Sequence, residues 1–141
     1  MELVHAALGD PDRSRPTLRI AVERRVLAKR RWRGVAEDGR KFGFDLEVPL
    51  ADGAAVFQSK VAIYVIAQKY EPVLEVALGT DAPRAARLGW IIGNLHFPLE
   101  VAGDVVWVED DSALRRLFER EHIPFVACKR VFHPLQGGHR H

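Results

Sequence analysis

Histidine is the residue type in this sequence most suited to chemistry, because a neutral imidazole binds divalent transition metals and titrates close to neutral pH. The chain has six histidines. His139 and His141 stand two positions apart at the C-terminus, after Gly137 and Gly138. Both imidazoles can therefore approach one ion, and imidazole suits nickel, copper or zinc better than magnesium or calcium. The alternative is a solvating tail or the remnant of a purification tag, although His-Arg-His is not a long histidine run.

His96 is the second candidate ligand, in the sequence Gly93-Asn94-Leu95-His96-Phe97-Pro98. We expect Gly93 or Asn94 to be the left-handed residue that ends a helix, which places His96 at an exposed corner before the next strand. A lone histidine there could equally be a helix cap or a partly buried core residue, and one imidazole cannot hold a metal. In a two-fold dimer whose axis passes this corner, the two copies of His96 would meet, and the tail histidines could complete the shell.

The residues available for catalysis have simpler structural interpretations. Cys128 lies among apolar residues, where a small buried thiol is the default. Glu109-Asp110-Asp111 could act as acid and base, but before a helix these carboxylates are more simply a cap, and His122 suits a helix end. Gly79-Thr80-Asp81 lacks the lysine and the spacing of a phosphate-binding loop. An enzyme would need His96, Cys128 and the carboxylates to converge in one pocket, so we expect no enzymatic activity.

A basic stretch at residues 24–33 suggests a different class of function. It could bind a phosphate backbone or an acidic protein surface, which would make the protein a nucleic-acid or ribosome-associated binding module. The alternative is a solvated strand face, because Trp32 is the only aromatic residue among these charges and no RNA-binding signature accompanies it. Phosphate binding would weaken steeply with salt, whereas metal coordination would weaken with acid. The stretch comprises Arg24, Arg25, Lys29, Arg30, Arg31 and Arg33.

The first half of the chain predicts short strands. Leu18, Ile20 and Val22 alternate with polar or small residues, as in a strand with one buried face. Asp38-Gly39 predicts a tight hairpin turn between strands 29–36 and 41–48, and further strands are expected at 54–59 and 61–66. Residues 1–69 are therefore expected to form a small all-β domain.

The second half predicts strands that alternate with helices, so the whole chain is expected to be α+β. Strands are expected at 72–78, 97–101, 105–109 and 124–132. A helix at 82–95 would be capped by Asp81, and a second helix, capped by Asp111 or Ser112, would run to Arg120 and bury Leu114, Leu117 and Phe118. The order βαββαβ over residues 70–133 is that of a ferredoxin-like domain. Residues 134–141 have little apolar content and are expected to form a mobile tail.

Composition limits the class of protein. The 141 residues are 48% hydrophobic and 28% charged, with 21 basic and 19 acidic residues, as in a soluble globular protein. No apolar run approaches the roughly 18 to 20 residues that span a bilayer, and Met1–Asp10 lacks the pattern of a secretory leader. We therefore expect a cytoplasmic protein with no membrane partner. The single cysteine excludes an internal disulfide and a self-contained zinc ribbon.

One motif and its context resemble a known family. Gly93-Asn94-Leu95-His96-Phe97-Pro98-Leu99, then Phe132-His133-Pro134 and the Gly-Gly-His-Arg-His ending, resemble the urease accessory protein UreE family of nickel metallochaperones. The resemblance covers essentially the whole chain, since members join an N-terminal β domain, here residues 1–69 for partner or peptide binding, to a ferredoxin-like metal-binding domain, here 70–133. The histidine-bearing tail would be residues 134–141.

The resemblance implies a function and a set of ligands. It implies a cytoplasmic homodimer that binds Ni(II), with Zn(II) as a competitor, and passes nickel to the apo-urease maturation complex together with an accessory GTPase. His96 would be the ligand at the interface, and His139 and His141 the ligands from the tail. The sequence departs from the family pattern at Leu95, where arginine is common, and at Glu109-Asp110-Asp111, where some members carry a His-x-His pair. Its tail has only two close histidines, which argues against storage of many ions.

Overall fold

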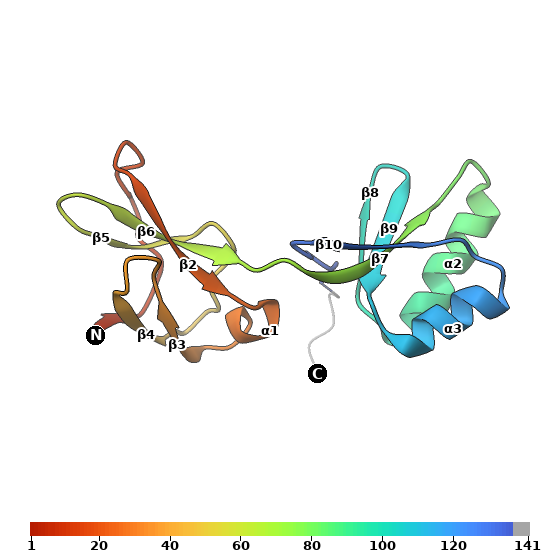
Figure 1. The fold of residues 1–141 in the computed structure, drawn as a ribbon, viewed down its shortest axis with the longest axis horizontal. Helices are drawn as coiled ribbons and strands as arrows, with labels where there is room; N and C mark the ends of the chain where they lie inside the picture. The colour runs from red at the N-terminus through yellow and green to blue at the C-terminus, as the bar shows by residue number, and fades with distance from the viewer. Residues whose placement is uncertain (137–141) are drawn as a thin grey trace. The chain divides into compact units, whose positions relative to one another are not determined.

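The computed structural model describes residues 1–136 of the chain. It divides into two compact units, Met1–Lys69 and Tyr70–His141, each of which has its own core (Figure 1). Within the described residues, none of the helices has the length and apolar content needed to cross a membrane. The class is mixed α+β, as the sequence predicts.

The first unit consists of two three-stranded sheets and one short helix. The sheets have the strand orders β1-β4-β3 and β2-β6-β5, in which β1 pairs with β4 and β2 pairs with β6 in parallel, while the other pairs are antiparallel. The elements are β1 (Glu2–Val4), β2 (Thr17–Val22), α1 (Arg24–Leu27), β3 (Arg31–Val35), β4 (Lys41–Asp45), β5 (Ala55–Gln58) and β6 (Ile63–Gln68).

The expected hairpin joins β3 to β4. Gly39 occupies the turn with φ of +88°, a conformation that glycine adopts without steric cost. Asp38 accepts a hydrogen bond from the Arg40 amide at 3.0 Å and another from the hydroxyl of the buried Tyr64 at 2.6 Å. The turn is therefore fastened to the core through a side chain of β6.

Aromatic residues fill the core of the first unit. Trp32 and Phe44 are directly paired across β3 and β4, and their rings stack with centroids 3.9 Å apart. Gly34 allows β2 to approach, because a Cβ at this position would lie 2.9 Å from Ile20 Cγ2. The close packing requires a glycine in the middle of β3, despite the weak strand propensity of this residue.

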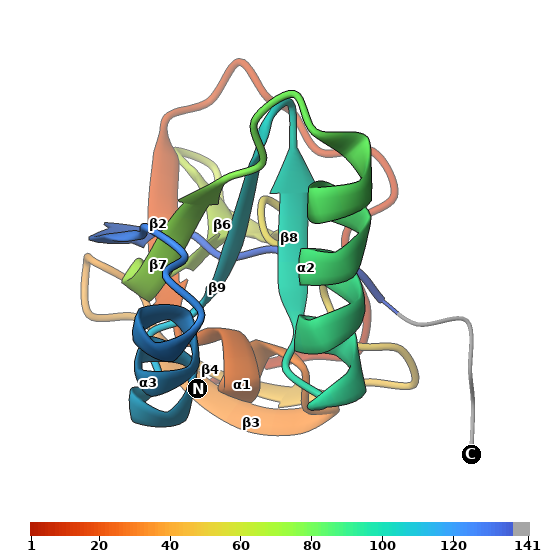
Figure 2. The ribbon, with the colours of Figure 1, turned by 90° about the vertical axis from the view of Figure 1, so that its right-hand side faces the viewer.

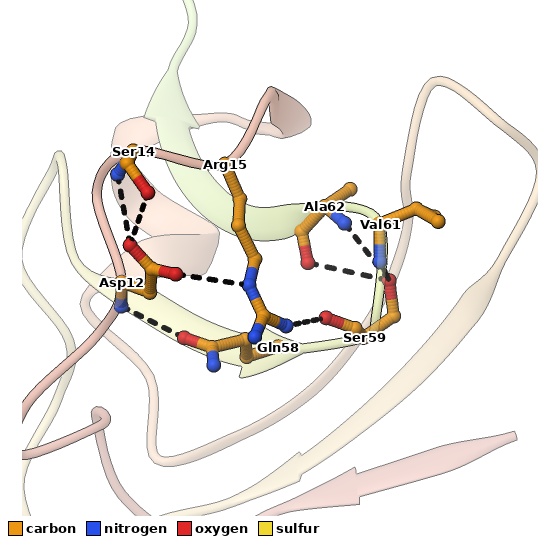
Figure 3. Close-up of polar contacts among 7 residues, drawn as sticks. All are labelled: Asp12, Ser14, Arg15, Gln58, Ser59, Val61 and Ala62. Atoms are coloured by element: carbon orange, nitrogen blue, oxygen red, sulfur yellow. Dashed lines mark hydrogen bonds and ion pairs between the residues drawn. The ribbon is translucent and has the colours of Figure 1, made fainter.

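The loop before β2 is fastened to the end of β5 by polar contacts (Figure 3). The Asp12 amide donates to Gln58 Oε1 at 2.8 Å, and the Arg15 guanidinium donates to Asp12 at 3.1 Å and also to the Ser59 carbonyl. The Ser14 hydroxyl and amide both donate to the Asp12 carboxylate, and these bonds hold the pKa of Asp12 below its ordinary value. The network explains how a long loop with few apolar residues is kept in place.

The second unit has the predicted element order, with four strands and two helices. Its sheet has the order β10-β7-β9-β8, and every neighbouring pair is antiparallel. The elements are β7 (Glu71–Ala77), α2 (Ala82–Asn94), β8 (Leu99–Ala102), β9 (Val105–Glu109), α3 (Ser112–Arg120) and β10 (Val126–Arg130).

Both helices of this unit cover the same face of its sheet (Figures 1 and 2). Asp81 caps α2 and Asp111 caps α3, each by accepting a hydrogen bond from a first-turn amide. The predicted apolar stripes are buried against the sheet. The core between sheet and helices comprises Leu74, Val76, Leu88, Ile92, Val106, Val108, Leu114, Leu117 and Phe118. A smaller cluster of Val73, Trp107 and Phe132 lies on the opposite face.

Candidate functional site

The corner at His96 is built by the end of α2. The His96 amide donates to the Gly93 carbonyl at 2.9 Å, and the Phe97 amide donates to the Ile92 carbonyl at 3.3 Å. This pair of bonds is a Schellman motif, and the apolar contact that accompanies it comes from Phe97 and Ile92 in the helix-covered core. His96 is the left-handed residue of the motif, with φ of +63°.

The expectation that Gly93 or Asn94 is the left-handed residue is wrong. Both lie within α2, which ends at Asn94, and neither has a positive φ. The helix continues to Asn94, the reversal occurs at His96, and Phe97 packs against the helix-covered core. The exposed position of His96 is as expected.

The second helix ends in the same way. The His122 amide donates to the Glu119 carbonyl at 3.2 Å, the Ile123 amide donates to the Phe118 carbonyl at 2.7 Å, and His122 has φ of +54°. Histidine is among the residues enriched in the left-handed region outside glycine. Backbone conformation alone therefore does not distinguish a functional His96 from a structural histidine.

The neighbours of the two histidines differ. Near His96, Trp90 of α2 is 68% exposed and Leu95 is 48% exposed. Near His122, the exposed residues are the charged Glu119, Arg120 and Glu121, followed by Pro124 and Val126. Exposed tryptophan and leucine side chains are typical of a contact surface, whereas a charged helix end is typical of a solvated one. The His96 corner therefore combines an accessible imidazole with exposed apolar residues close in sequence, as does His133 with Leu135, which is 65% exposed.

A single chain does not supply a complete metal site in the part that the structure describes. No group of three or more histidine, cysteine, aspartate or glutamate side chains is close enough there to hold an ion. His139 and His141 lie outside the described residues. In the first unit, His5 Nδ1 lies 3.0 Å from the Asp45 carbonyl oxygen, a structural hydrogen bond.

The carboxylates before α3 have structural roles. Asp110 forms a two-bond ion pair with Arg115, with distances of 2.6 and 2.8 Å, and this pair holds the pKa of the Asp110 carboxyl below its ordinary value. Asp111 accepts the helix-capping bond from Ala113 at 2.8 Å. Cys128 of β10 is partly buried and packs against the apolar cluster on the sheet face opposite the helices. These groups do not form a catalytic arrangement with His96 in the described residues.

The basic stretch does not form a single strand face. Arg24 and Arg25 belong to α1, whereas Arg31 and Arg33 project from β3, and Arg31 forms an ion pair with Asp45 at 3.1 Å. The expectation of strands only in this half is therefore wrong. The local sequence pattern did not predict α1. Its N-cap residue, Glu23, makes no side-chain capping bond, and only Leu27 of its four residues is buried.

Sequence reasoning also missed a cluster around Glu100 in β8. Its carboxylate accepts a hydrogen bond from Arg130 Nη2 and another from the His133 amide, both at 3.0 Å. The Leu135 amide donates to the Leu99 carbonyl at 2.7 Å, so residues 134–136 begin against β8, in contrast to the free tail expected from position 134. The only sequence signal was the apolar Phe132, which is fully buried.

Comparison with known proteins gives the same family for both parts of the chain. The family model described as "UreE urease accessory protein, C-terminal domain" matches residues 71–141. The urease accessory protein UreE of Paracoccus denitrificans (strain Pd 1222) is 32% identical over 121 residues, which cover 84% of this chain and 73% of that protein. The chain belongs to the UreE family.

Other UreE proteins are similar over most of the chain. The one from Bacillus sp. (strain TB-90) is 28% identical over 121 residues, covering 82% of this chain and 80% of that protein. The one from Burkholderia thailandensis is 29% identical over 132 residues, covering 89% of this chain and 61% of that protein. The UreE family match spans the second unit, including the His96 corner, the Glu100 cluster and the positions of His139 and His141.

Proposed function

We propose that this protein is a nickel metallochaperone, not an enzyme, that delivers Ni(II) for assembly of the urease active site. The observation that carries the proposal is the His96 corner, where an exposed imidazole follows the exposed Trp90 and Leu95 along the chain in a domain of the UreE family. Membership of the family supports the link to urease. Nickel is the cargo in this proposal, and zinc, which imidazole also binds, is its competitor.

The ligand count favours a homodimer. One His96 provides one nitrogen, whereas nickel takes four to six ligands, so a second copy of the chain across a two-fold axis is the simplest source of another imidazole. The exposed Trp90 and Leu95 are suitable for burial in such a contact. His139 and His141 of the tail would add further nitrogen ligands around the same ion.

The two units would have different roles in this function. Residues 70–133 would be the ferredoxin-like metal-binding domain, and residues 1–69 would bind a partner or peptide. In the cytoplasm the dimer would meet an accessory GTPase and the apo-urease maturation complex, to which the nickel passes. The acidic residues 109–111 would not provide an auxiliary site, because Asp110 is paired with Arg115 and Asp111 caps α3.

Calorimetric titration with Ni(II) tests the proposal, and the chain contains its own control. His96→Ala should abolish tight nickel binding and leave the fold intact, because an exposed side chain leaves no cavity. His122→Ala changes the same residue type at the same backbone position of α3, and it should leave nickel affinity within about twofold of the parent. Equal nickel affinity of the parent and His96→Ala would contradict the proposal.

A further inference from the structure

A groove of the first unit lies where two neighbouring strands end. β1 and β4 run in parallel, so the loops that follow them leave the sheet at the same end (Figure 1). Residues 5–7 after β1 and residues 45–51 at the end of β4 and beyond it line the groove, together with Ala54. Its volume is about 680 Å³, within the range of about 300 to 1,000 Å³ that is typical of ligand pockets.

The lining of this groove is mostly apolar. Leu46 and Leu50 are buried members of the core of the first unit, so the groove borders that core. Val48 is 74% exposed, and the small side chains of Ala6 and Ala7 are exposed on the facing loop. An accessible apolar groove of this size is suited to aliphatic side chains from another molecule.

The basic stretch flanks the groove. The Leu46 amide donates to the Arg30 carbonyl oxygen at 2.9 Å, and Asp45 is directly paired with Arg31 across β4 and β3. Arg33 lies two residues further along β3, on the same sheet face as Arg31. The residues of β3 and of the turn before it are therefore immediate neighbours of the groove lining.

The charges at the groove have a positive balance. Arg31 and Asp45 form an ion pair at 3.1 Å, so their charges offset each other. Glu47 adds one exposed carboxylate to the lining, and it is outnumbered by exposed cations of the basic stretch. These cations are Lys29, Arg30 and Arg33. Such a surface attracts an acidic partner and disfavours a basic one.

We propose that this groove binds an acidic segment of a partner protein, whose aliphatic side chains enter the groove while its aspartate or glutamate side chains meet the basic stretch. The inference rests on the proposed partner-binding role of residues 1–69, for which it names the surface and the chemistry of the partner. A nucleic acid fits this surface less well. Among the described residues that line the groove, none is a phenylalanine, tyrosine or tryptophan on which a base could stack.

Selection from a random peptide library tests the chemistry of the partner. Peptides displayed on phage and retained by the immobilised full chain should be enriched in aspartate or glutamate beside leucine, isoleucine or valine. The synthesised consensus peptide should bind more weakly as salt is added. Enrichment of basic peptides, or no enrichment, would overturn the proposal. Tighter binding of a random single-stranded RNA, lost in Arg30→Glu, would also overturn it in favour of nucleic acid.

Matched charge variants test the basic side of the groove with the consensus peptide. Arg30→Glu should weaken binding at least about tenfold, because attraction is replaced by repulsion. Arg13→Glu reverses the same charge at an exposed residue outside the lining and should change affinity less than about twofold. Glu47→Gln should strengthen binding, since it removes a like charge. Equal losses in the two arginine variants, or weaker binding of Glu47→Gln, would overturn the assignment.

A second matched pair tests the apolar lining. Val48→Ser should weaken the consensus peptide about three- to tenfold, because apolar contact area is lost without a change of charge. Val61→Ser, at a residue that is 75% exposed and outside the lining, should keep the parent affinity. Circular dichroism checks that each variant keeps the parent fold. Equal affinities of the two serine variants would overturn the groove as the binding site.

These peptide measurements use no nickel. A parent chain that binds no Ni(II) would overturn the nickel proposal, and the peptides would still decide the role of the groove. Failed peptide selection by a chain that binds Ni(II) would overturn the groove alone.

Discussion

His96 and His122 both adopt a left-handed backbone conformation that costs free energy for a residue with a Cβ but not for glycine. A left-handed residue with a Cβ is strained by about 1 to 2 kcal/mol, although histidine tolerates this region better than most. Both helices end with the same bonds and the same residue type, so the strain reflects how the chain leaves a helix. The functional assignment of His96 depends instead on its exposed apolar neighbours.

Glycine substitution should therefore stabilise the fold at both positions. We expect His96→Gly and His122→Gly each to raise the free energy of unfolding by about 0.5 to 1 kcal/mol, because relief of strain exceeds the added flexibility of the unfolded chain. Urea denaturation measures this change. Only His96→Gly should lose nickel binding, and a destabilised His96→Gly would show that the imidazole makes a structural contact in the native state.

Tyr64 and Asp38 provide a pH-dependent contact. The hydrogen bond from the Tyr64 hydroxyl, together with the Arg40 amide, holds the pKa of Asp38 below 3.8. The same bond, followed by burial, raises the pKa of Tyr64 above 10.0. A lowered carboxyl pKa stabilises the folded state above the unfolded value, and this contribution is lost as the pH falls below about 3.8.

Replacement of Tyr64 should change this acid response. Tyr64→Phe should raise the pKa of Asp38 toward 3.8 and reduce the loss of stability on acidification below that pH. The carboxyl carbon chemical shift of Asp38, followed by NMR against pH, measures the first effect. A pKa of Asp38 that stays at the parent value would show that the backbone amides alone hold the carboxylate charged.

At the scale of elements, local signals predicted most of the fold. Asp81 and Asp111 predict the starts of α2 and α3, and Asp38-Gly39 predicts the hairpin. These signals can be recognised in the sequence because a helix cap and a tight turn each involve residues close together in the chain. The end of α2 was not predictable from glycine alone, because the Schellman bonds put the reversal at His96, and Ile92 and Phe97 both pack in the helix-covered core. The short α1 lacks both a capping side chain and an acidic first turn, so its formation depends on the surrounding core.

The two helix caps should differ in strength. Asp111 accepts its capping bond at 2.8 Å, and Asp81 accepts its bond at 3.3 Å. We expect Asp111→Ala to cost about 1 kcal/mol of unfolding free energy and Asp81→Ala to cost less, since the shorter bond is the stronger one. Urea denaturation of both variants gives the comparison. A larger loss of unfolding free energy for Asp81→Ala would mean that the length of the capping bond does not predict which cap stabilises the protein more.

At the scale of the whole molecule, the sequence predicts a candidate site at His96, which stays a prediction, but it does not predict the contacts that support this region. The motif around His96 identified the corner, because its residues are contiguous. Glu100 is 30 residues from Arg130 and 33 residues from His133 in the sequence, so no local pattern predicts these two contacts. The exposure of Trp90 could not be predicted from the sequence either, because a tryptophan in an amphipathic helix is more often buried.

The proposed dimer makes a prediction about Trp90. Trp90→Glu should shift the protein toward a monomer and weaken nickel binding, because a charge would lie in the contact, while the fold of the chain should be unchanged. Analytical ultracentrifugation measures the mass. Val61→Glu, at a residue of the first unit that is 75% exposed, is the matched control and should leave the dimer intact. A dimer that tolerates Trp90→Glu would place the contact elsewhere.

Native mass spectrometry during a Ni(II) titration tests the central claim most directly, since it reports the number of chains and the number of ions together. The account predicts that the first tightly held ion appears on a dimer, at one Ni(II) per two chains, and that His96→Ala removes it. A monomer that binds one ion per chain with no change in assembly would contradict the claim that His96 residues of two chains share the metal.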